Sequence, residues 1–143
     1  MNTDHFKNLT LIPALLRTLA EEGYKKPTPV QDAAIPLVLA GKDLMAAAQT
    51  GTGKTAAFAL PILQMLYGRS SGEDERIRAL ILTPTRELAL QVEESFRCYG
   101  RHIPLQTTAV IGGVSSARQI KALKKNPDIL VATPGRLLDL FEQ

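Results

Sequence analysis

The stretch DLMAAAQTGTGKTAAFALPILQMLYG, residues 43–68, decides the fold class. It consists of a short apolar run, a glycine-rich turn and a helical stretch. Short apolar runs that alternate with helical stretches are typical of β–α units, and this alternation predicts an α/β domain with a parallel sheet. The pattern recurs three more times, as RALILTP (78–84) with RELALQVEESFRCYG (86–100), LQTTAVIG (105–112) with SSARQIKALKK (115–125), and DILVATP (128–134) with GRLLDLFEQ (135–143). We therefore predict four strands, the first over residues 43–49.

Two of the apolar runs have no polar residue between their ends, which predicts strands buried on both faces of the sheet. These runs are ALIL at 79–82 and ILVA at 129–132. Ahead of the β–α units, the pattern predicts an amphipathic helix over 10–20 and a second helix from residue 28 to Gly41. We expect two parts, the N-terminal helices at 1–41 and a core at 42–143 that forms part of one domain.

The composition is that of an ordinary globular chain. It has 143 residues, a net charge of +3 and a single cysteine, Cys98, which excludes an internal disulfide and fits a reducing compartment. No apolar run approaches the ~18 residues of a membrane span, so we expect a soluble, cytoplasmic protein.

Residues 76–143 carry ten basic and six acidic side chains, which suggests an anionic partner or merely a solvated surface. The polar stretch 68–76 predicts a loop, and we assign its acidic cluster, 73–75, to solvent rather than to a metal.

A glycine-rich loop, GTGKT at 51–55, joins the first predicted strand to its helix. A loop that wraps a pyrophosphate brings several backbone N–H groups close to the oxygens, and glycines leave room for that approach. Lys54 can then reach the β and γ phosphates, and the Thr55 hydroxyl is placed to bind Mg2+. We predict a nucleotide site with these two residues as catalytic groups. The alternative is a glycine-rich turn followed by a surface lysine.

Five short motifs are spread over essentially the whole chain. They are GYKKPTPVQ (23–31), AQTGTGKT (48–55), PTRELA (84–89), the pair Gly112-Gly113 and TPGR (133–136). Their order and spacing resemble the first RecA-like domain of a DEAD-box ATP-dependent RNA helicase. Phe6 stands 17 residues before Gly23, where that family carries an isolated aromatic residue. Ala48, which replaces the first glycine of the general phosphate-loop pattern, is also the usual residue of the family.

The resemblance implies that ATP and Mg2+ bind to the first two motifs. Gln31 resembles the glutamine whose amide donor and acceptor read adenine. Tyr24 resembles the aromatic residue that stacks on the base, Lys26 lies near the base, and Phe6 supports the loop. Taken singly, Gln31 also fits a surface position, and Tyr24 and Phe6 also fit core packing. The implied nucleotide residues are Phe6, Tyr24, Lys26, Gln31, Ala48, Gln49, Thr50, Gly51, Thr52, Gly53, Lys54 and Thr55, with Thr55 as the Mg2+ ligand.

The other three motifs each follow a predicted strand, at the carboxyl edge where open α/β sheets bind ligands. The resemblance implies that they contact the RNA backbone. Helix N-termini, close-packed glycines and arginines suit phosphate contacts that do not read the bases. Singly, the arginines fit a solvated helix surface and the glycine pair fits an ordinary turn. The implied RNA residues are Pro84, Thr85, Arg86, Gly112, Gly113, Thr133, Pro134, Gly135 and Arg136.

The sequence contains no Asp-Glu-Ala-Asp motif and no Ser-Ala-Thr motif. In the family that the chain resembles, the Asp-Glu-Ala-Asp motif supplies the Mg2+-binding acid and the residue that orients the attacking water, and a second RecA-like domain supplies arginines for phosphoryl transfer. We therefore expect a truncated, monomeric first domain that binds nucleotide and RNA weakly without hydrolysis. The parent would be an ATP-dependent RNA helicase. The alternatives are a non-enzymatic nucleotide- or protein-binding module and, less well supported by the motifs, another phosphate-loop enzyme.

Overall fold

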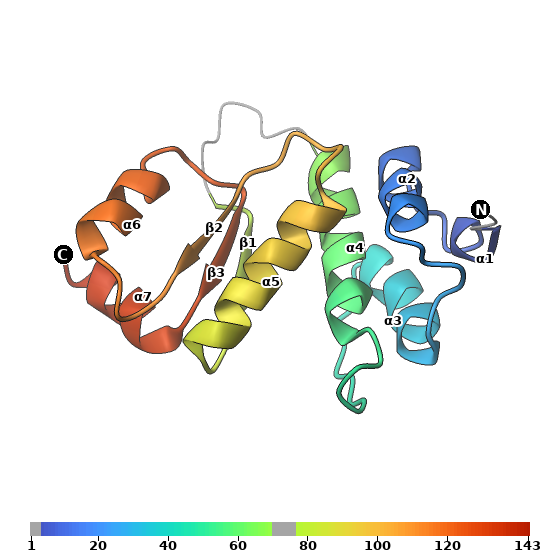
Figure 1. Cartoon of the computed structure of the whole chain (residues 1–143), viewed down its shortest axis with the longest axis horizontal. Coiled ribbons are helices and arrows are strands. Elements are labelled where there is room, and N and C mark those ends of the chain that lie inside the picture. The colour runs from blue at the N-terminus through green and yellow to red at the C-terminus, as the bar shows by residue number, and fades with distance from the viewer. Residues whose placement is uncertain (1–3, 70–76) are drawn as a thin grey trace. The chain divides into compact units, whose positions relative to one another are not determined.

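The computed structural model describes residues 4–69 and 77–143, and its contacts divide the chain into two compact units. Unit 1 comprises residues 1–69 and 98–104, and unit 2 comprises residues 70–97 and 105–143 (Figure 1). Most of the predicted polar loop, including the acidic cluster, lies outside the described residues. The predicted division at residue 41 stays a prediction. Among the described residues, no helix has the length and apolar character needed to cross a bilayer.

Unit 1 is helical, and its two predicted N-terminal helices are confirmed. The second of them begins with a capping box, in which Thr28 and Gln31 bond to each other's backbone N–H groups. The unit contains α1 (Asp4–Lys7), α2 (Pro13–Glu21), α3 (Pro29–Leu39) and α4 (Lys54–Gly68). Helix α3 packs along α4. The largest fully buried apolar side chains of the unit are Phe6, Leu15, Leu19, Ile35, Leu60 and Leu63, each of which stabilises the fold by about 1.5–3 kcal/mol.

Unit 2 is an α/β layer structure around a parallel sheet, which confirms the predicted fold class. Its elements are β1 (Ala79–Leu82), α5 (Arg86–Tyr99, whose last two residues belong to unit 1), β2 (Thr107–Val110), α6 (Ser116–Leu123), β3 (Ile129–Ala132) and α7 (Pro134–Phe141). The strand order is β1-β3-β2, and Ala132 is in register with both Leu82 and Val110. The three strands therefore end level with one another, and the segments that follow them emerge at one edge.

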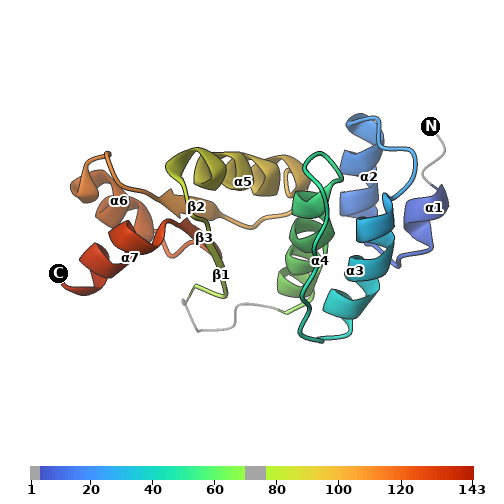
Figure 2. The same cartoon turned by 90° about the horizontal axis from the view of Figure 1, so that it is seen from below.

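Helices cover both faces of this sheet. Helix α5 lies on one side, and α6 and α7 lie on the other (Figures 1 and 2). On the α6–α7 side, Val110, Leu130 and Ala132 form a buried cluster that is covered by leucines of the two helices. Strand β3 is buried at every position, as predicted. Strand β1 is not, because Leu80 and Leu82 are 51% and 56% exposed. The prediction for β1 was wrong because β1 lies at the edge of the sheet, whereas β3 is central.

The predicted first strand is absent from the structure. Residues 42–49 contain no strand, and the side chain of Met45 is 98% exposed. An apolar run forms a strand only where a neighbouring strand completes its backbone hydrogen bonds. The three-stranded sheet of the described residues does not include this segment. The sequence therefore predicted one strand too many, although the helix that follows the segment, α4, forms as expected.

Candidate nucleotide and RNA sites

The phosphate loop of unit 1 folds back on itself ahead of α4. The Lys54 amino group donates a hydrogen bond to the carbonyl of Ala48 at 2.7 Å, and the Thr52 hydroxyl donates to the carbonyl of Gln49 at 2.6 Å. Gly53 precedes the first turn of α4, where no side chain caps the helix. The unpaired N–H groups at this end, together with the helix dipole, form an arrangement that suits a phosphate group.

Gln31 connects the base-side motif to this loop. Its side-chain nitrogen donates a hydrogen bond to the carbonyl of Gly53 at 3.2 Å, and its side-chain oxygen accepts one from the backbone N–H of Thr28 at 3.0 Å. Gln31 is 1% exposed, so the predicted adenine reader lies buried between α3 and the phosphate loop. A Cβ at Gly53 would overlap the Gln31 amide, and Gly53 has a φ of 82°, so both packing and backbone conformation require glycine here.

Two of the remaining base-side residues have definite surroundings. Phe6 is completely buried in unit 1. The hydroxyl groups of Tyr24 and Tyr99 share a hydrogen bond at 3.0 Å, and their rings meet edge to face with centroids 6.2 Å apart. Burial is the main cause that raises the pKa of Tyr99, and the hydrogen bond with Tyr24 raises it further. The third, Lys26, is exposed. The roles of these residues toward a nucleotide stay predictions.

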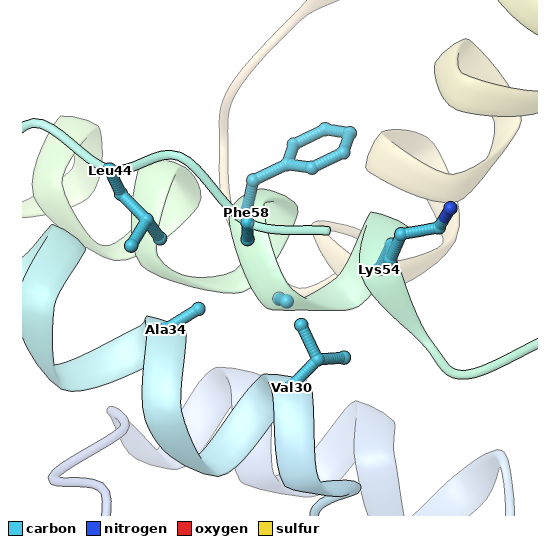
Figure 3. Close-up of a pocket in the computed structure, with 7 residues that line it drawn as sticks. Val30, Ala34, Leu44, Lys54 and Phe58 are labelled. Atoms are coloured by element: carbon cyan, nitrogen blue, oxygen red, sulfur yellow. The ribbon is translucent and has the colours of Figure 1, made fainter. Parts of the chain in front are cut away.

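A cavity of about 210 Å3 lies beside the loop, between α3, α4 and the 42–49 segment (Figure 3). Lys54 is the only charged residue of its lining, and the amino group of Lys54 is turned toward Ala48. The other lining residues are Val30, Ala34, Leu44, Ala46, Ala57 and Phe58. Because these other side chains are all apolar and the Lys54 amino group bonds to Ala48 in the loop, the loop remains the candidate phosphate site.

The residues at the loop fit a magnesium nucleotide better than free Mg2+. Among the described residues, no group of three or more His, Cys, Asp or Glu side chains could hold a metal. Mg2+ usually keeps several waters and binds through few protein groups together with phosphate oxygens. The Thr55 hydroxyl, in the first turn of α4, is a suitable single protein ligand for an ion that arrives with the nucleotide.

In unit 2, the three motifs implied to bind RNA line one groove. Its volume is about 510 Å3, and it lies where the strands end. Eight of the nine predicted RNA residues line it, namely Pro84, Thr85, Arg86, Gly112, Thr133, Pro134, Gly135 and Arg136. The ninth, Gly113, packs against Arg86 so closely that a Cβ would overlap the guanidinium group. Residues scattered over 53 positions of sequence, from 84 to 136, are thus gathered at one edge of the sheet.

Both arginines of the groove are anchored to the turn after β2. Arg86 Nη1 donates a hydrogen bond to the carbonyl of Gly112 at 3.4 Å. Arg136 Nη1 donates to the carbonyl of Val114 at 2.8 Å and to the side-chain oxygen of Gln119 at 3.0 Å. The turn therefore sets the spacing of two positive charges that face a single groove.

The comparisons with known proteins agree with this geometry. Residues 28–143 match the model of the DEAD/DEAH box helicase family. The chain belongs to this family. Among curated helicases, it is 48% identical over 134 residues to the DEAD-box ATP-dependent RNA helicase RhpA of Helicobacter pylori, which covers 94% of this chain and 26% of RhpA. It is 46% identical over 140 residues to the human probable ATP-dependent RNA helicase DDX47, covering 98% of this chain and 30% of DDX47.

Solved helicase structures share the fold. The RNA helicase Prp28 of Chaetomium thermophilum, solved with ADP, matches with a TM-score of 0.85 and 42% identity over 94% of this chain and 33% of that one. A hypothetical ATP-dependent RNA helicase of Sulfolobus tokodaii matches with a TM-score of 0.80 and 42% identity over 90% and 36%. The fold is therefore that of a RecA-like helicase domain. The chain spans between about a quarter and just over a third of the length of these relatives.

Two acidic side chains that line the groove, and a glutamine that bonds to its Arg136, were missed from the sequence. Glu87 and Asp139 line the groove, and the Asp139 carboxylate lies 3.9 Å from Nε of Arg136. Gln119 is buried and accepts a hydrogen bond from Arg136. The two acidic residues could have been found, because Glu87 follows Arg86 directly and Asp139 follows Arg136 by one helical turn. No local signal marks Gln119, whose partners lie 8 and 17 residues away.

Proposed function

We propose that the chain is the nucleotide- and RNA-binding part of an ATP-dependent RNA helicase. The Gln31–Gly53 hydrogen bond is the observation that carries this proposal, because it joins the base-side motif directly to the phosphate loop. A nucleotide held at both ends by one connected structure can be recognised by its base and by its phosphates together. The relatives named above are called ATP-dependent RNA helicases, which supports the same assignment.

The nucleotide residues divide the work of binding. The α4 N-terminus and the loop amides hold the phosphates, and Lys54 exchanges its bond with Ala48 for one with the β and γ phosphates. The Thr55 hydroxyl would hold Mg2+, which would supply charge neutralisation when bound. The Gln31 amide still has one N–H and one lone pair after its two hydrogen bonds, and these can match the adenine edge once the atoms that bury this side chain move aside. Tyr24 stacks on the base, with Lys26 near it and Phe6 supporting the fold.

RNA binds to the groove of unit 2 through its phosphates. Arg86 and Arg136 supply charge, and the α7 N-terminus supplies the unpaired N–H groups that follow Thr133. Such contacts depend on the backbone, so binding is independent of base sequence. Glu87 and Asp139 disfavour a second phosphate close to the arginines and so limit where the strand can lie.

Cys98, the only cysteine, fits a reducing compartment, and we place the protein in the cytoplasm as a monomer.

The 143-residue polypeptide is expected to bind ligands without turnover. The sequence holds none of the acidic residues that the resemblance assigns to Mg2+ and to the attacking water. The resemblance also assigns to a second RecA-like domain the arginines that stabilise the transition state, and one such arginine raises the rate of phosphoryl transfer by about 10^3 to 10^5. The parent helicase would couple ATP binding and hydrolysis to the separation of RNA strands.

Calorimetric titration with ADP and GDP tests the nucleotide proposal. We expect ADP to bind more tightly than GDP, and Lys54→Ala to raise the Kd for both by at least about tenfold, roughly 1.4 kcal/mol. Lys42→Ala, at an exposed position in the same unit, is the matched control and should change neither Kd. Equal affinity for ADP and GDP would remove base reading from Gln31. Failure of both nucleotides to bind would leave the non-enzymatic protein-binding module as the better assignment.

A further inference from the structure

Gln119 lies at the centre of a buried hydrogen-bond bridge beneath the RNA groove. It is 6% exposed and comes from α6. Its side-chain nitrogen donates to the carbonyl of Ile111 at 2.9 Å, and its side-chain oxygen accepts from Arg136 Nη1 at 3.0 Å. The amide therefore links the end of β2 to the side chain that enters the groove from α7.

The polarity of this bridge matches a side-chain amide, and neither a carboxylate nor an apolar side chain of the same size can supply it. The end that faces the Ile111 carbonyl must donate, and the end that faces the guanidinium must accept. A buried amide is tolerated only where both ends are satisfied. The bond to Arg136 is charge-assisted and hence stronger than one between neutral groups. Gln119 is thus held in one orientation, and it holds Arg136 in turn.

The bridge fixes the guanidinium without exhausting it. Both hydrogen bonds to Gln119 and Val114 are made by Nη1, so the donors on Nε and Nη2 are left for other partners. Asp139, 3.9 Å from Nε, is the group that competes for them. An arginine side chain has several rotatable bonds, and ordering it at the moment of binding costs free energy. Because the bridge already orders the Arg136 side chain in the free protein, this free energy is not lost when RNA binds.

We propose that Gln119 is a positioning residue for RNA, which orients the Arg136 guanidinium toward a backbone phosphate in the groove. This inference rests on the proposed RNA contact of Arg136. It assigns a function to a buried residue outside the five motifs. If Gln119 served only to fill the interior, an apolar side chain of similar length would preserve RNA binding. If it positions Arg136, that replacement removes the contribution of Arg136 although the arginine is still present.

The test measures binding of a fluorescein-labelled oligouridine by anisotropy as a function of salt. Each phosphate contact to a single strand contributes about 0.7 to the slope of log K against log salt, equivalent to about fivefold in affinity at ~0.1 M salt. We expect Gln119→Met and Arg136→Ala each to lose about this much, and the double variant to lose no more than either alone. Gln91→Met, an exposed glutamine of α5, is the control.

The outcomes separate the inference from the function on which it rests. If Arg136→Ala leaves RNA binding unchanged, the RNA contact itself is wrong. If Arg136→Ala weakens binding while Gln119→Met does not, or if the two losses add, the positioning role is overturned. A second readout does not need RNA. In the free protein, the guanidinium N–H resonances of Arg136 should be resolved by NMR and should average in Gln119→Met, and unchanged resonances would contradict the proposal. Should Gln119→Met fail to fold, Gln119→Asn, which keeps the amide but is one methylene too short to span both partners, is read by the same resonances and should also average them.

Discussion

The side-chain amide of Gln31 and the backbone carbonyl of Gly53, 22 residues apart in sequence, are joined by a hydrogen bond of 3.2 Å. The same glutamine closes the capping box that starts α3. One side chain therefore fixes the beginning of a helix and the end of the phosphate loop. Anything that pushes the two apart should disturb both, which makes Gly53 a sensitive position.

Gly53→Ala is expected to weaken nucleotide binding more than Gly51→Ala. Both glycines have φ values near +80°, so an alanine at either position carries similar backbone strain, about 1–3 kcal/mol. Only at Gly53 would the new Cβ overlap Gln31, because nothing lies within 4 Å of a Cβ at Gly51. Thermal unfolding and ADP titration of both variants measure the difference. Equal losses in the two variants would show that strain, not the contact with Gln31, accounts for the effect.

Gly113→Ala is expected to weaken RNA binding more than Gly112→Ala. A Cβ at Gly113 would overlap the Arg86 guanidinium and would also sit on a backbone with φ of 76°. A Cβ at Gly112 meets nothing within 4 Å. RNA affinity should fall about fivefold at ~0.1 M salt, the value of one phosphate contact. If the loss arises through Arg86, adding Arg86→Ala to Gly113→Ala should cause no further loss. Additive losses would mean that Gly113 acts independently.

Stability should decline at alkaline pH because of Tyr99. Burial is the main cause that raises the pKa of Tyr99 above the ordinary 10.0, and its bond to Tyr24 adds to it. A group whose pKa is raised on folding stabilises the fold below its unfolded pKa, and that stability is lost as the pH rises through the folded value. We expect the unfolding midpoint to fall above about pH 10 and Tyr99→Phe to flatten this fall. Tyr67→Phe, at an exposed tyrosine, should leave it unchanged.

At acidic pH the relevant group is Glu21. Its carboxylate accepts a hydrogen bond from His102 at 2.9 Å and pairs with Arg101 and Arg17, each at 3.0 Å. The bond to His102 is the largest cause that lowers the pKa of Glu21 below 4.5. Such a group stabilises the fold above its unfolded pKa, and the stability is lost as the pH falls through the lowered value. NMR titration should place the Glu21 pKa below 4.5, and His102→Ala should raise it.

The sequence was sufficient for the elements that depend on local pattern. Apolar periodicity predicts the helices α2 and α3 and the three β–α units of unit 2. The rule that parallel strands end together predicts the edge where the three motifs meet. The groove could be predicted for the same reason. Each of its motifs follows a strand directly, so that once the sheet is parallel the motifs must converge.

The failures lie where a residue depends on partners far away in the sequence. Whether 43–49 forms a strand depends on a neighbouring strand, and the apolar run by itself cannot supply one. The exposed side of β1 depends on its edge position, which composition does not reveal. The hydrogen bonds of Gln119 depend on the turn after β2 and on α7. The Thr28-Pro-Val-Gln31 capping box, by contrast, was a readable local signal that the sequence interpretation overlooked.

All twelve candidate nucleotide residues come from unit 1, and all nine candidate RNA residues come from unit 2. Each candidate site therefore belongs to a different compact unit. A substitution that disrupts the RNA groove is expected to leave the nucleotide site intact, and the reverse also holds. Selection could therefore change the affinity for one ligand without changing the affinity for the other.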